Sequence, residues 1–380
     1  MKVLYIVQNI PLPGRESNDV ILTLAEKISA FSEVQFVNPA EYVPWFLRNS
    51  EKYRHLYGLE DWLHNNKHVF VYKYWRLPLK KYAFVLLNGI SGINRQLSDK
   101  IDLNEVDVCH AHYILPDGYL AYLIKKKWGI PYVLSVRVSD LKILGNKSNT
   151  NPDFIKAKKV VASASKVIAL NARLKEFIES RFDSPCEIIP HGIEEDYISE
   201  ENINRPQDKV RLISVGAMIE RKNHDWTIEF IKNYKGKQDI SLELIGDGPE
   251  LDRLRKLAAG DTRINFTGRV RREEVIVHLK KGDVFVLPSV NETFGLVYLE
   301  AAANHNALLG LKNEGVWGVF AENREMLFAA DRDQYFIMLE KLVEDRNLRE
   351  KLQVNAHRKV SGLTWQNIAL RYKELYSSIH

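Results

Sequence analysis

The sequence predicts an α/β protein with two doubly wound, Rossmann-like domains that face each other across a cleft. A length of 380 residues is typical of two domains of ordinary size. Short apolar runs alternate with longer amphipathic segments, the pattern of parallel strands joined by helices. A polar, Pro-containing stretch divides these runs into two series. We therefore expect an N-terminal domain over 1–195, a linker over 196–209, a C-terminal domain over 210–362, and a helix over 363–380 that packs back on the N-terminal domain.

The elements of each series follow from apolar runs of strand length and from amphipathic segments of helix length. In the first series we expect strands at 3–7, 34–37, 106–110, 132–136, 167–170 and 187–189, and helices at 18–29, 118–128, 152–163 and 171–181. In the second series we expect strands at 210–215, 241–245, 264–267, 283–287 and 307–309. In open sheets of this kind, ligands bind at the carboxyl ends of the strands.

The composition excludes several classes of protein. With 45% hydrophobic and 27% charged residues the chain is neither disordered nor fibrous, and two cysteines are too few for a disulfide framework or a zinc site. A net charge of +5 permits an acidic ligand or a membrane surface, but it lacks the basic excess of a DNA-binding domain. The first apolar run is too short for a signal peptide, and no stretch reaches the ~18 apolar residues that span a bilayer. We expect a cytoplasmic protein, with the inner face of the plasma membrane as an alternative location.

One segment in the second series carries the strongest chemical signal. An apolar run ends at Pro288, a short loop carries Glu292, and a helix is expected to begin near Gly295. The unpaired N–H groups at a helix start attract an anion, and a glycine leaves room for its approach. Glu300 is expected about one turn into that helix, where a carboxylate accepts hydrogen bonds from a vicinal diol, as on a ribose. The alternative is a surface pair of glutamates at an ordinary strand–helix junction.

This segment resembles the Glu-x7-Glu signature of the retaining family 4 glycosyltransferases, which have the two-domain architecture called GT-B. Further family-like segments occur in the same order as in the family, and they cover nearly the whole chain. They are Asp107-Val108-Cys109-His110-Ala111-His112-Tyr113, Pro116-Asp117-Gly118, Ile189-Pro190-His191-Gly192-Ile193, Val215-Gly216 with Glu220-Arg221-Lys222-Asn223, Leu244-Ile245-Gly246-Asp247-Gly248-Pro249-Glu250, and Phe266-Thr267-Gly268-Arg269-Val270.

The resemblance implies a role for each matching residue. Glu300 would bind the ribose, Glu292 the donor sugar, and Lys222 the diphosphate. Preorganised cations and helix-start amides stabilise a departing diphosphate, and no Asp-x-Asp metal motif is present, so we expect no cofactor and no metal. The full set of expected donor-binding residues is Gly14, Arg221, Lys222, Arg269, Val270, Phe294, Gly295, Leu296 and Glu300.

The N-terminal domain contributes His112, which the family resemblance places near the donor sugar as a catalytic residue beside Glu292. A structural, hydrogen-bonded histidine is the alternative. We expect His110 to point to the opposite face of the strand and to pack there. Arg137 and Asp140 follow the next strand, where an arginine suits the donor phosphates or an acidic acceptor, and a structural ion pair is an equal alternative.

The acceptor side of such enzymes is usually the N-terminal domain, where residues 72–84 interleave basic and aromatic side chains and 124–128 form a second basic cluster. This composition suits a membrane interface and a lipid-linked saccharide acceptor. A solvated face whose aromatic stems pack inward is an equal alternative. No nucleic-acid-binding signature accompanies these residues.

The sequence therefore predicts a metal-independent, retaining hexosyltransferase-type enzyme that moves a sugar from a nucleoside-diphosphate-sugar to a hydroxyl acceptor, in surface polysaccharide or glycolipid biosynthesis. Four departures from the family concern loops: a single glycine in 11–17, Ala217 where many relatives have arginine, residues 303–307 in place of a small-Gly-x-Pro stretch, and an idiosyncratic loop at 313–318. They leave two alternatives, an inactive nucleotide-sugar-binding subunit and a UDP-sugar 2-epimerase of the same architecture. A Rossmann oxidoreductase is disfavoured, since residues 11–17 lack its Gly-x-Gly-x-x-Gly turn.

Overall fold

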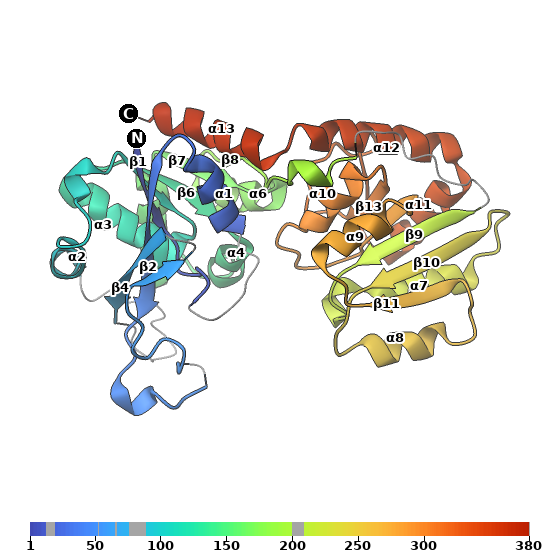
Figure 1. Ribbon diagram of the computed structural model, residues 1–380, viewed down its shortest axis with the longest axis horizontal. Helices are drawn as coiled ribbons and strands as arrows, with labels where there is room; N and C mark the ends of the chain where they lie inside the picture. Colours follow the sequence, from blue (N-terminus) through green and yellow to red (C-terminus); the bar gives the residue numbers. More distant parts are fainter. Residues whose placement is uncertain (13–19, 52, 65–66, 76–88, 200–208, 380) are drawn as a thin grey trace. The chain divides into compact units, whose positions relative to one another are not determined.

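The chain forms two compact α/β units, seen in the computed structural model of Figure 1. The structure describes residues 1–12, 20–51, 53–64, 67–75, 89–199 and 209–379. Unit 1 comprises Met1–Leu170, Leu174–Ile189 and Ile368–His380, and unit 2 comprises Asn171–Arg173 and Pro190–Asn367. Both are α/β with parallel sheets, as the alternation of apolar runs predicts.

Unit 1 is built on an eight-stranded sheet in the order β3-β4-β2-β1-β5-β6-β7-β8. Its strands are β1 (Lys2–Ile6), β2 (Glu33–Glu41), β3 (Trp62–His64), β4 (Lys67–Tyr74), β5 (Val108–Ala111), β6 (Tyr132–Val136), β7 (Lys166–Ala169) and β8 (Glu187–Ile188). All neighbours pair in parallel except β3 and β4. All residues of β5 and β6 are buried, which explains why they are continuous apolar runs rather than alternating ones. The strand order reverses at β1, whose neighbours are β2 and β5, and such a switch point is where open sheets bind ligands.

The helices of unit 1 follow the strands in alternation. They are α1 (Val20–Ile28), α2 (Gly89–Leu97), α3 (Tyr119–Trp128), α4 (Val138–Leu144), α5 (Pro152–Ser163) and α6 (Ala172–Phe182), which belongs to this unit from Leu174 onward, with the end of α13 (Trp365–Ser377) added from the C-terminus. Proline at the first turn and the Asn151 side chain as the N-cap explain why α5 begins where the sequence predicts. Tyr376 of α13 lies in the core of unit 1, where its hydroxyl is 3.2 Å from that of Tyr5 on β1.

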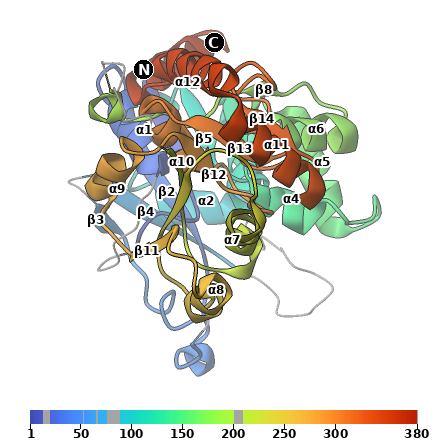
Figure 2. The same cartoon turned by 90° about the vertical axis from the view of Figure 1, so that its right-hand side faces the viewer.

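Unit 2 contains a six-stranded, fully parallel sheet in the order β11-β10-β9-β12-β13-β14. Its strands are β9 (Val210–Val215), β10 (Ile240–Ile245), β11 (Ile264–Gly268), β12 (Val284–Val286), β13 (Ala307–Leu311) and β14 (Leu327–Ala329). Its helices are α7 (His224–Asn233), α8 (Leu251–Ala258), α9 (Arg272–Leu279), α10 (Leu296–Ala303), α11 (Arg332–Glu344) and α12 (Arg346–Ser361). Figure 2 labels α9 and α11 on opposite sides of β12 and β13, as in a doubly wound sheet. The order reverses between β9 and β12, so the loops after these two strands meet at a second switch point.

The unit boundary differs by a few residues from the domain limits expected from the sequence. Residues 190–195 belong to unit 2 rather than to the N-terminal domain, and residues 363–367 also belong to unit 2. The reason is a backbone exchange in which the Ile193 N–H donates to the Leu363 carbonyl and the Trp365 N–H donates to the Ile193 carbonyl. Much of the expected linker, 200–208, lies outside the described residues.

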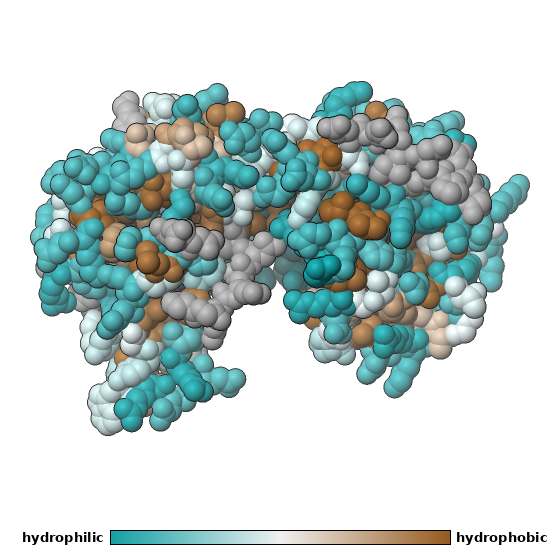
Figure 3. Space-filling view, in the orientation of Figure 1, coloured by the Kyte–Doolittle hydropathy of each residue, from teal (hydrophilic) through white to brown (hydrophobic). Residues whose placement is uncertain are grey.

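The surface shown in Figure 3 is mainly hydrophilic, with separate hydrophobic patches. Among the described residues, no helix combines the length and the apolar character needed to cross a bilayer.

Candidate functional site

Two loops of unit 2 meet at the carboxyl ends of β9 and β12. The first follows Gly216 and forms a short 3-10 helix, η5 (Glu220–Lys222). The second runs from Pro288 to the start of α10. The Val290 N–H donates to the Arg221 carbonyl at 2.8 Å, and the Asn223 side chain donates to the Pro288 carbonyl at 2.8 Å. These bonds hold the two loops side by side.

Glycines make the close approach of the first loop possible. Gly246 has a φ of 142°, and a Cβ there would lie 1.9 Å from the Gly216 carbonyl oxygen, so no other residue fits. A Cβ on Gly216 would lie 3.5 Å from Cε of Lys222. The lysine stem therefore passes directly over Gly216.

The second loop turns on residues with positive φ. Asn291 has a φ of 54°, and Gly295, at 81°, precedes the first residue of α10. A Cβ on Gly295 would be 2.9 Å from the Tyr298 ring, and the Tyr298 hydroxyl donates to the Leu287 carbonyl at 2.6 Å. This packing fixes the loop that carries Glu292.

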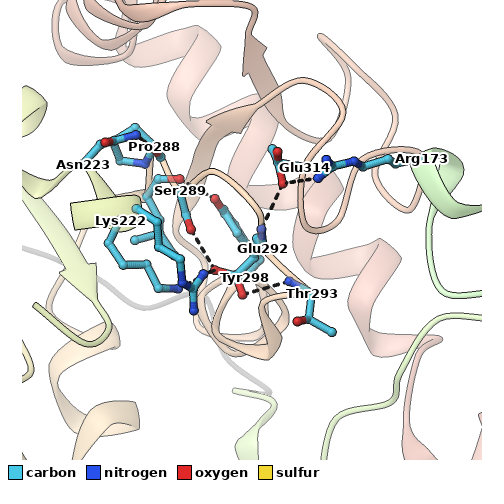
Figure 4. Close-up of polar contacts among 11 residues, drawn as sticks. Arg173, Lys222, Asn223, Pro288, Ser289, Glu292, Thr293, Tyr298 and Glu314 are labelled. Atoms are coloured by element: carbon cyan, nitrogen blue, oxygen red, sulfur yellow. Dashed lines mark hydrogen bonds and ion pairs between the residues drawn. The ribbon is translucent and has the colours of Figure 1, made fainter. Parts of the chain in front are cut away.

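The two loops join in a buried ion pair between Lys222 and Glu292, each 8% exposed (Figure 4). The Lys222 ammonium contacts Oε2 of Glu292, the Ser289 hydroxyl donates to the same oxygen at 2.9 Å, and Nη1 of Arg221 lies 3.7 Å from it. Burial alone raises the pKa of the Glu292 carboxyl, but Lys222, Ser289 and Arg221 outweigh it, so the pKa lies below its ordinary value. The carboxylate therefore stays ionised.

A second ion pair supports the main chain of Glu292. The Glu292 N–H donates to Oε2 of Glu314 at 2.9 Å, and Nη1 of Arg173 lies 2.7 Å from the same oxygen (Figure 4). Glu314 belongs to the idiosyncratic loop at 313–318, and Arg173 lies at the start of α6.

Glu300 lies on α10 and pairs with Arg272 of α9. Nε and Nη2 of Arg272 donate to Oε1 of Glu300 at 3.0 and 2.8 Å. The Glu300 side chain is buried, and burial raises the pKa of its carboxyl although Arg272 opposes the rise. Glu300 and Glu292 thus come from one strand–loop–helix segment, but they have different partners, and the ribose role of Glu300 stays a prediction.

The remaining predicted donor-site residues of unit 2 have different environments. Phe294 is buried, with its ring centroid 5.0 Å from that of His191, and Leu296 is partly buried as the first residue of α10. Arg269 is exposed and Val270 is partly buried, both just after β11. Gly14 lies outside the described residues.

Unit 1 contains the other predicted residues in a separate buried cluster. Nη2 of Arg137 lies 3.0 Å from Nδ1 of His112, and both side chains are buried. A guanidinium only donates hydrogen bonds, so Nδ1 accepts, and the imidazole is neutral with its proton on Nε2. Asp140 accepts from the Arg137 N–H at 2.9 Å and the Ile114 N–H at 3.0 Å, so it caps α4. Burial raises the pKa of the Asp140 carboxyl to about 7, against these hydrogen bonds.

The expectation that His110 points away from His112 is wrong. The two rings stack at 4.1 Å between centroids, because residues two positions apart on a strand share a face. His110 does pack in the core, where Nδ1 is 2.6 Å from the Tyr376 hydroxyl and Nε2 is 2.8 Å from the Ser135 hydroxyl. Burial, with a contribution from Arg137, lowers the pKa of His110 well below its ordinary value.

The two basic-aromatic stretches are only partly exposed where the structure describes them. Tyr72 and Tyr74 of β4 are buried, Trp75 is 40% exposed, and 76–84 lie outside the described residues. In the second stretch Ile124 is buried and the Lys127 ammonium lies 4.3 Å from the Trp128 ring centroid. Inward-packed tyrosines thus account for the start of the first stretch.

Four residues that pair with or support Glu292 and Glu300 were not predicted from the sequence: Arg173, Arg272, Ser289 and Glu314. Ser289 directly follows the strand end that the sequence singles out, so its position is a usable signal. Arg173 and Glu314 are paired across 141 positions of the chain, which no local pattern reveals. Within the described part of the chain, no three His, Cys, Asp or Glu side chains gather as a metal site would require.

Comparison with known proteins identifies the family. The model described as "Glycosyl transferases group 1" matches residues 197–359, and the model "Glycosyltransferase Family 4" matches residues 41–197. An uncharacterised glycosyltransferase of Methanocaldococcus jannaschii is 24% identical over 73% of this chain and 77% of its own. The putative teichuronic acid biosynthesis glycosyltransferase TuaC of Bacillus subtilis is 29% identical over 58% of this chain and 57% of its own, so that match spans little more than half of the relative.

Solved structures share the whole fold. Sucrose-phosphate synthase from Thermosynechococcus elongatus has a TM-score of 0.67 at 16% identity, covering 100% of this chain and 98% of that one. Anabaena HepE, solved in complex with UDP, has a TM-score of 0.66 at 14% identity. The match covers 100% of this chain and 100% of HepE. The chain belongs to the family 4 glycosyltransferases, enzymes with the GT-B fold.

Proposed function

Starting from this family membership, we propose that the protein transfers a sugar from a nucleoside-diphosphate-sugar to a hydroxyl acceptor, with retention of anomeric configuration and without a metal ion. The observation that carries the proposal is the buried Lys222–Glu292 pair beside Gly216 and the start of α10. A buried ion pair costs desolvation free energy and is weak evidence for a purely stabilising role, so we assign this pair a functional use.

In this proposal the pair is the ligand-free form of a donor site. The incoming diphosphate replaces Glu292 as the partner of Lys222, with Arg221 nearby as a second cation. The first N–H groups of α10 supply fixed dipoles for the charge that grows on the leaving phosphate. Glu292, released from Lys222, then accepts hydrogen bonds from hydroxyls of the donor sugar.

The proposed chemical step needs no enzymic nucleophile. The acceptor oxygen attacks the anomeric carbon from the face that the leaving group vacates, and the bond from that carbon to the phosphate oxygen breaks. The acceptor proton passes to an oxygen of the departing diphosphate, so all charges and atoms balance. The resemblance to retaining family 4 enzymes supports this course. Cations that are part of the protein stabilise the leaving group, which is why we propose metal independence.

The names of relatives suggest the substrates. HepE is solved with UDP and TuaC is named for teichuronic acid biosynthesis, so we propose a nucleotide-sugar donor and a role in surface polysaccharide or glycolipid assembly. We propose that the acceptor binds in unit 1. A cavity of about 420 Å³ there is lined partly by Asn9, Glu41 and His55, polar groups that suit sugar hydroxyls.

A thermal-shift and turnover experiment tests the proposal. UDP, GDP, UDP-glucose and GDP-mannose are screened against the wild type, Lys222→Met, Glu300→Ala and a control, Lys232→Met, whose lysine lies near the end of α7 and donates to the Leu257 carbonyl. One base is expected to stabilise the wild type and the control only, and EDTA is expected to change neither binding nor transfer. Indifference of the wild type to every nucleotide would overturn the proposal. Binding without transfer to any acceptor would instead support an inactive binding subunit.

A further inference from the structure

Three consecutive residues at the start of α6 hold the loop at 313–318. Nδ2 of Asn171 donates to the Gly315 carbonyl at 2.7 Å, the Ala172 N–H donates to the Trp317 carbonyl at 2.9 Å, and Arg173 pairs with Glu314 at 2.7 Å. We call Asn171–Arg173 the anchor segment and residues 313–318 the anchored loop. The side chain of Asn171 is fully buried, so its bond is protected from water.

The anchored loop in turn contacts the main chain of Glu292. Oε2 of Glu314 accepts the Glu292 N–H at 2.9 Å. A Cβ on Gly315, where φ is 49°, would lie 3.0 Å from the Phe294 carbonyl oxygen and 3.4 Å from Cγ of Glu292. The loop therefore packs against both the backbone and the side-chain stem of Glu292.

The two ends of Glu292 thus have separate supports. Its carboxylate is directed at Lys222, while its N–H is directed at Glu314, as Figure 4 shows. A single oxygen of Glu314, Oε2, accepts hydrogen bonds from both the Glu292 N–H and the Arg173 guanidinium. The Arg173 and Glu314 side chains are only 26% and 14% exposed, so water competes little for these charge-assisted hydrogen bonds.

We propose that Arg173 and Glu314 are positioning residues for recognition of the donor sugar. This inference rests on the proposed function above and adds to it. When a diphosphate takes Lys222 from Glu292, the carboxylate loses its partner, but the backbone stays fixed through Glu314. The anchored loop then presents the Glu292 carboxylate to the sugar hydroxyls in one orientation. The proposal assigns neither residue to the phosphates, so their effect is expected to be confined to the sugar half of the donor.

The test separates the two halves of the donor. Dissociation constants are measured for UDP and UDP-glucose, or for GDP and GDP-mannose if the wild type binds guanosine nucleotides, together with kcat for transfer. Glu314→Ala and Arg173→Met are expected to weaken binding of the sugar nucleotide by about tenfold relative to binding of the free diphosphate. This ratio corresponds to the loss of one positioned hydrogen bond. Binding of the free diphosphate is expected to stay within about twofold of the wild type.

Matched variants sharpen the result. Glu314→Gln keeps an oxygen for the Glu292 N–H but loses the charge that holds Arg173, so its effect is expected to be intermediate. Glu350→Gln breaks the Arg346–Glu350 pair of α12, whose atoms are 2.7 Å apart, and is expected to change neither the ratio of the two dissociation constants nor kcat. Arg173→Lys keeps the charge and serves as the second variant if Arg173→Met does not fold.

Each outcome decides the matter. If binding of the free diphosphate and of the sugar nucleotide is weakened equally, Arg173 and Glu314 have a general structural role and the proposal is overturned. An unchanged ratio of the two dissociation constants in every variant would overturn it too. If the wild type binds no nucleotide at all, the donor site itself is wrong and the inference falls with it. If the wild type binds and transfers the sugar and the variants behave like it, only the positioning role is overturned and the proposed function stands.

Discussion

The two buried polar clusters described above, one in each unit, differ in which groups stay ionised. In unit 2, burial raises the pKa of Glu292, but Lys222, Ser289 and Arg221 together outweigh it and hold that pKa below its ordinary value. In unit 1, burial prevails, so the pKa of Asp140 rises to about 7 and that of His110 falls. The first cluster therefore keeps the Glu292 carboxylate ionised and in contact with Lys222. In the second cluster, burial disfavours the charged forms of Asp140 and His110, which lie near the Arg137 guanidinium. The difference suggests that unit 2 is built to exchange ionic partners and unit 1 to donate and accept hydrogen bonds as neutral groups.

The largest expected effect comes from removing the cation of unit 2. Lys222→Met is expected to lower kcat/KM for transfer by about 10²–10³-fold, because a preorganised positive charge no longer faces the leaving diphosphate. Steady-state kinetics measure this effect, with Lys232→Met as the control. A loss below threefold would show that the ammonium does not stabilise the reaction.

A smaller effect is expected in the cluster of unit 1. His112→Ala is expected to lower kcat by about 10–100-fold, the cost of one or two lost hydrogen bonds to a polar substrate group. The exposed His68→Ala is the control, and both variants are compared by turnover and by thermal unfolding. Unchanged turnover in His112→Ala would assign this histidine to the structural alternative.

The pH dependence of stability tests the contrast in ionisation. The folded pKa of Asp140, about 7, lies above the ordinary unfolded value, so the folded state binds more protons between roughly pH 4 and pH 7. This carboxyl therefore removes up to about 1.4 kcal/mol of stability per pH unit as the pH rises through that interval. Asp140→Asn is expected to lack this contribution. Urea denaturation at several pH values measures it, and parallel curves for the two proteins would contradict it.

The smallest effect is expected at the edge of the unit 1 cluster. Tyr376→Phe removes the hydroxyl between His110 and Tyr5, and it is expected to cost about 1–2 kcal/mol of unfolding free energy. Tyr57→Phe, at a tyrosine 43% exposed, is the control and is expected to change stability little. An equal stability of both variants would show that the buried hydroxyl contributes nothing to stability.

The regular parts of the fold could be predicted because local patterns determine them. The strands at 132–136 and 210–215 and the helix at 152–163 have the predicted limits, since buried parallel strands are continuous apolar runs and a proline follows the helix cap. The strand β4 was not predicted. Its lysines and tyrosines resemble an interface composition, although Tyr72 and Tyr74 face the core.

The sequence singles out residues for the candidate site, and their binding roles stay predictions, but it does not predict the contacts among them. Lys222 and Glu292 lie in recognisable motifs, whereas their direct pairing depends on two loops with positive φ that meet at a switch point. The support of Glu292 by Glu314 and Arg173 joins segments far apart in the chain. Such pairings arise from tertiary structure, and a single sequence contains no signal for them.

The last helix affects how the molecule can be divided for experiments. Tyr372 and Tyr376, close to the C-terminus, are buried among residues of unit 1 such as Tyr5 and His110. A fragment cut after residue 189 would lack these rings and expose the apolar surface that they cover. An isolated N-terminal half should therefore be produced with the segment 368–380 fused to it, and affinity tags are better placed away from that helix.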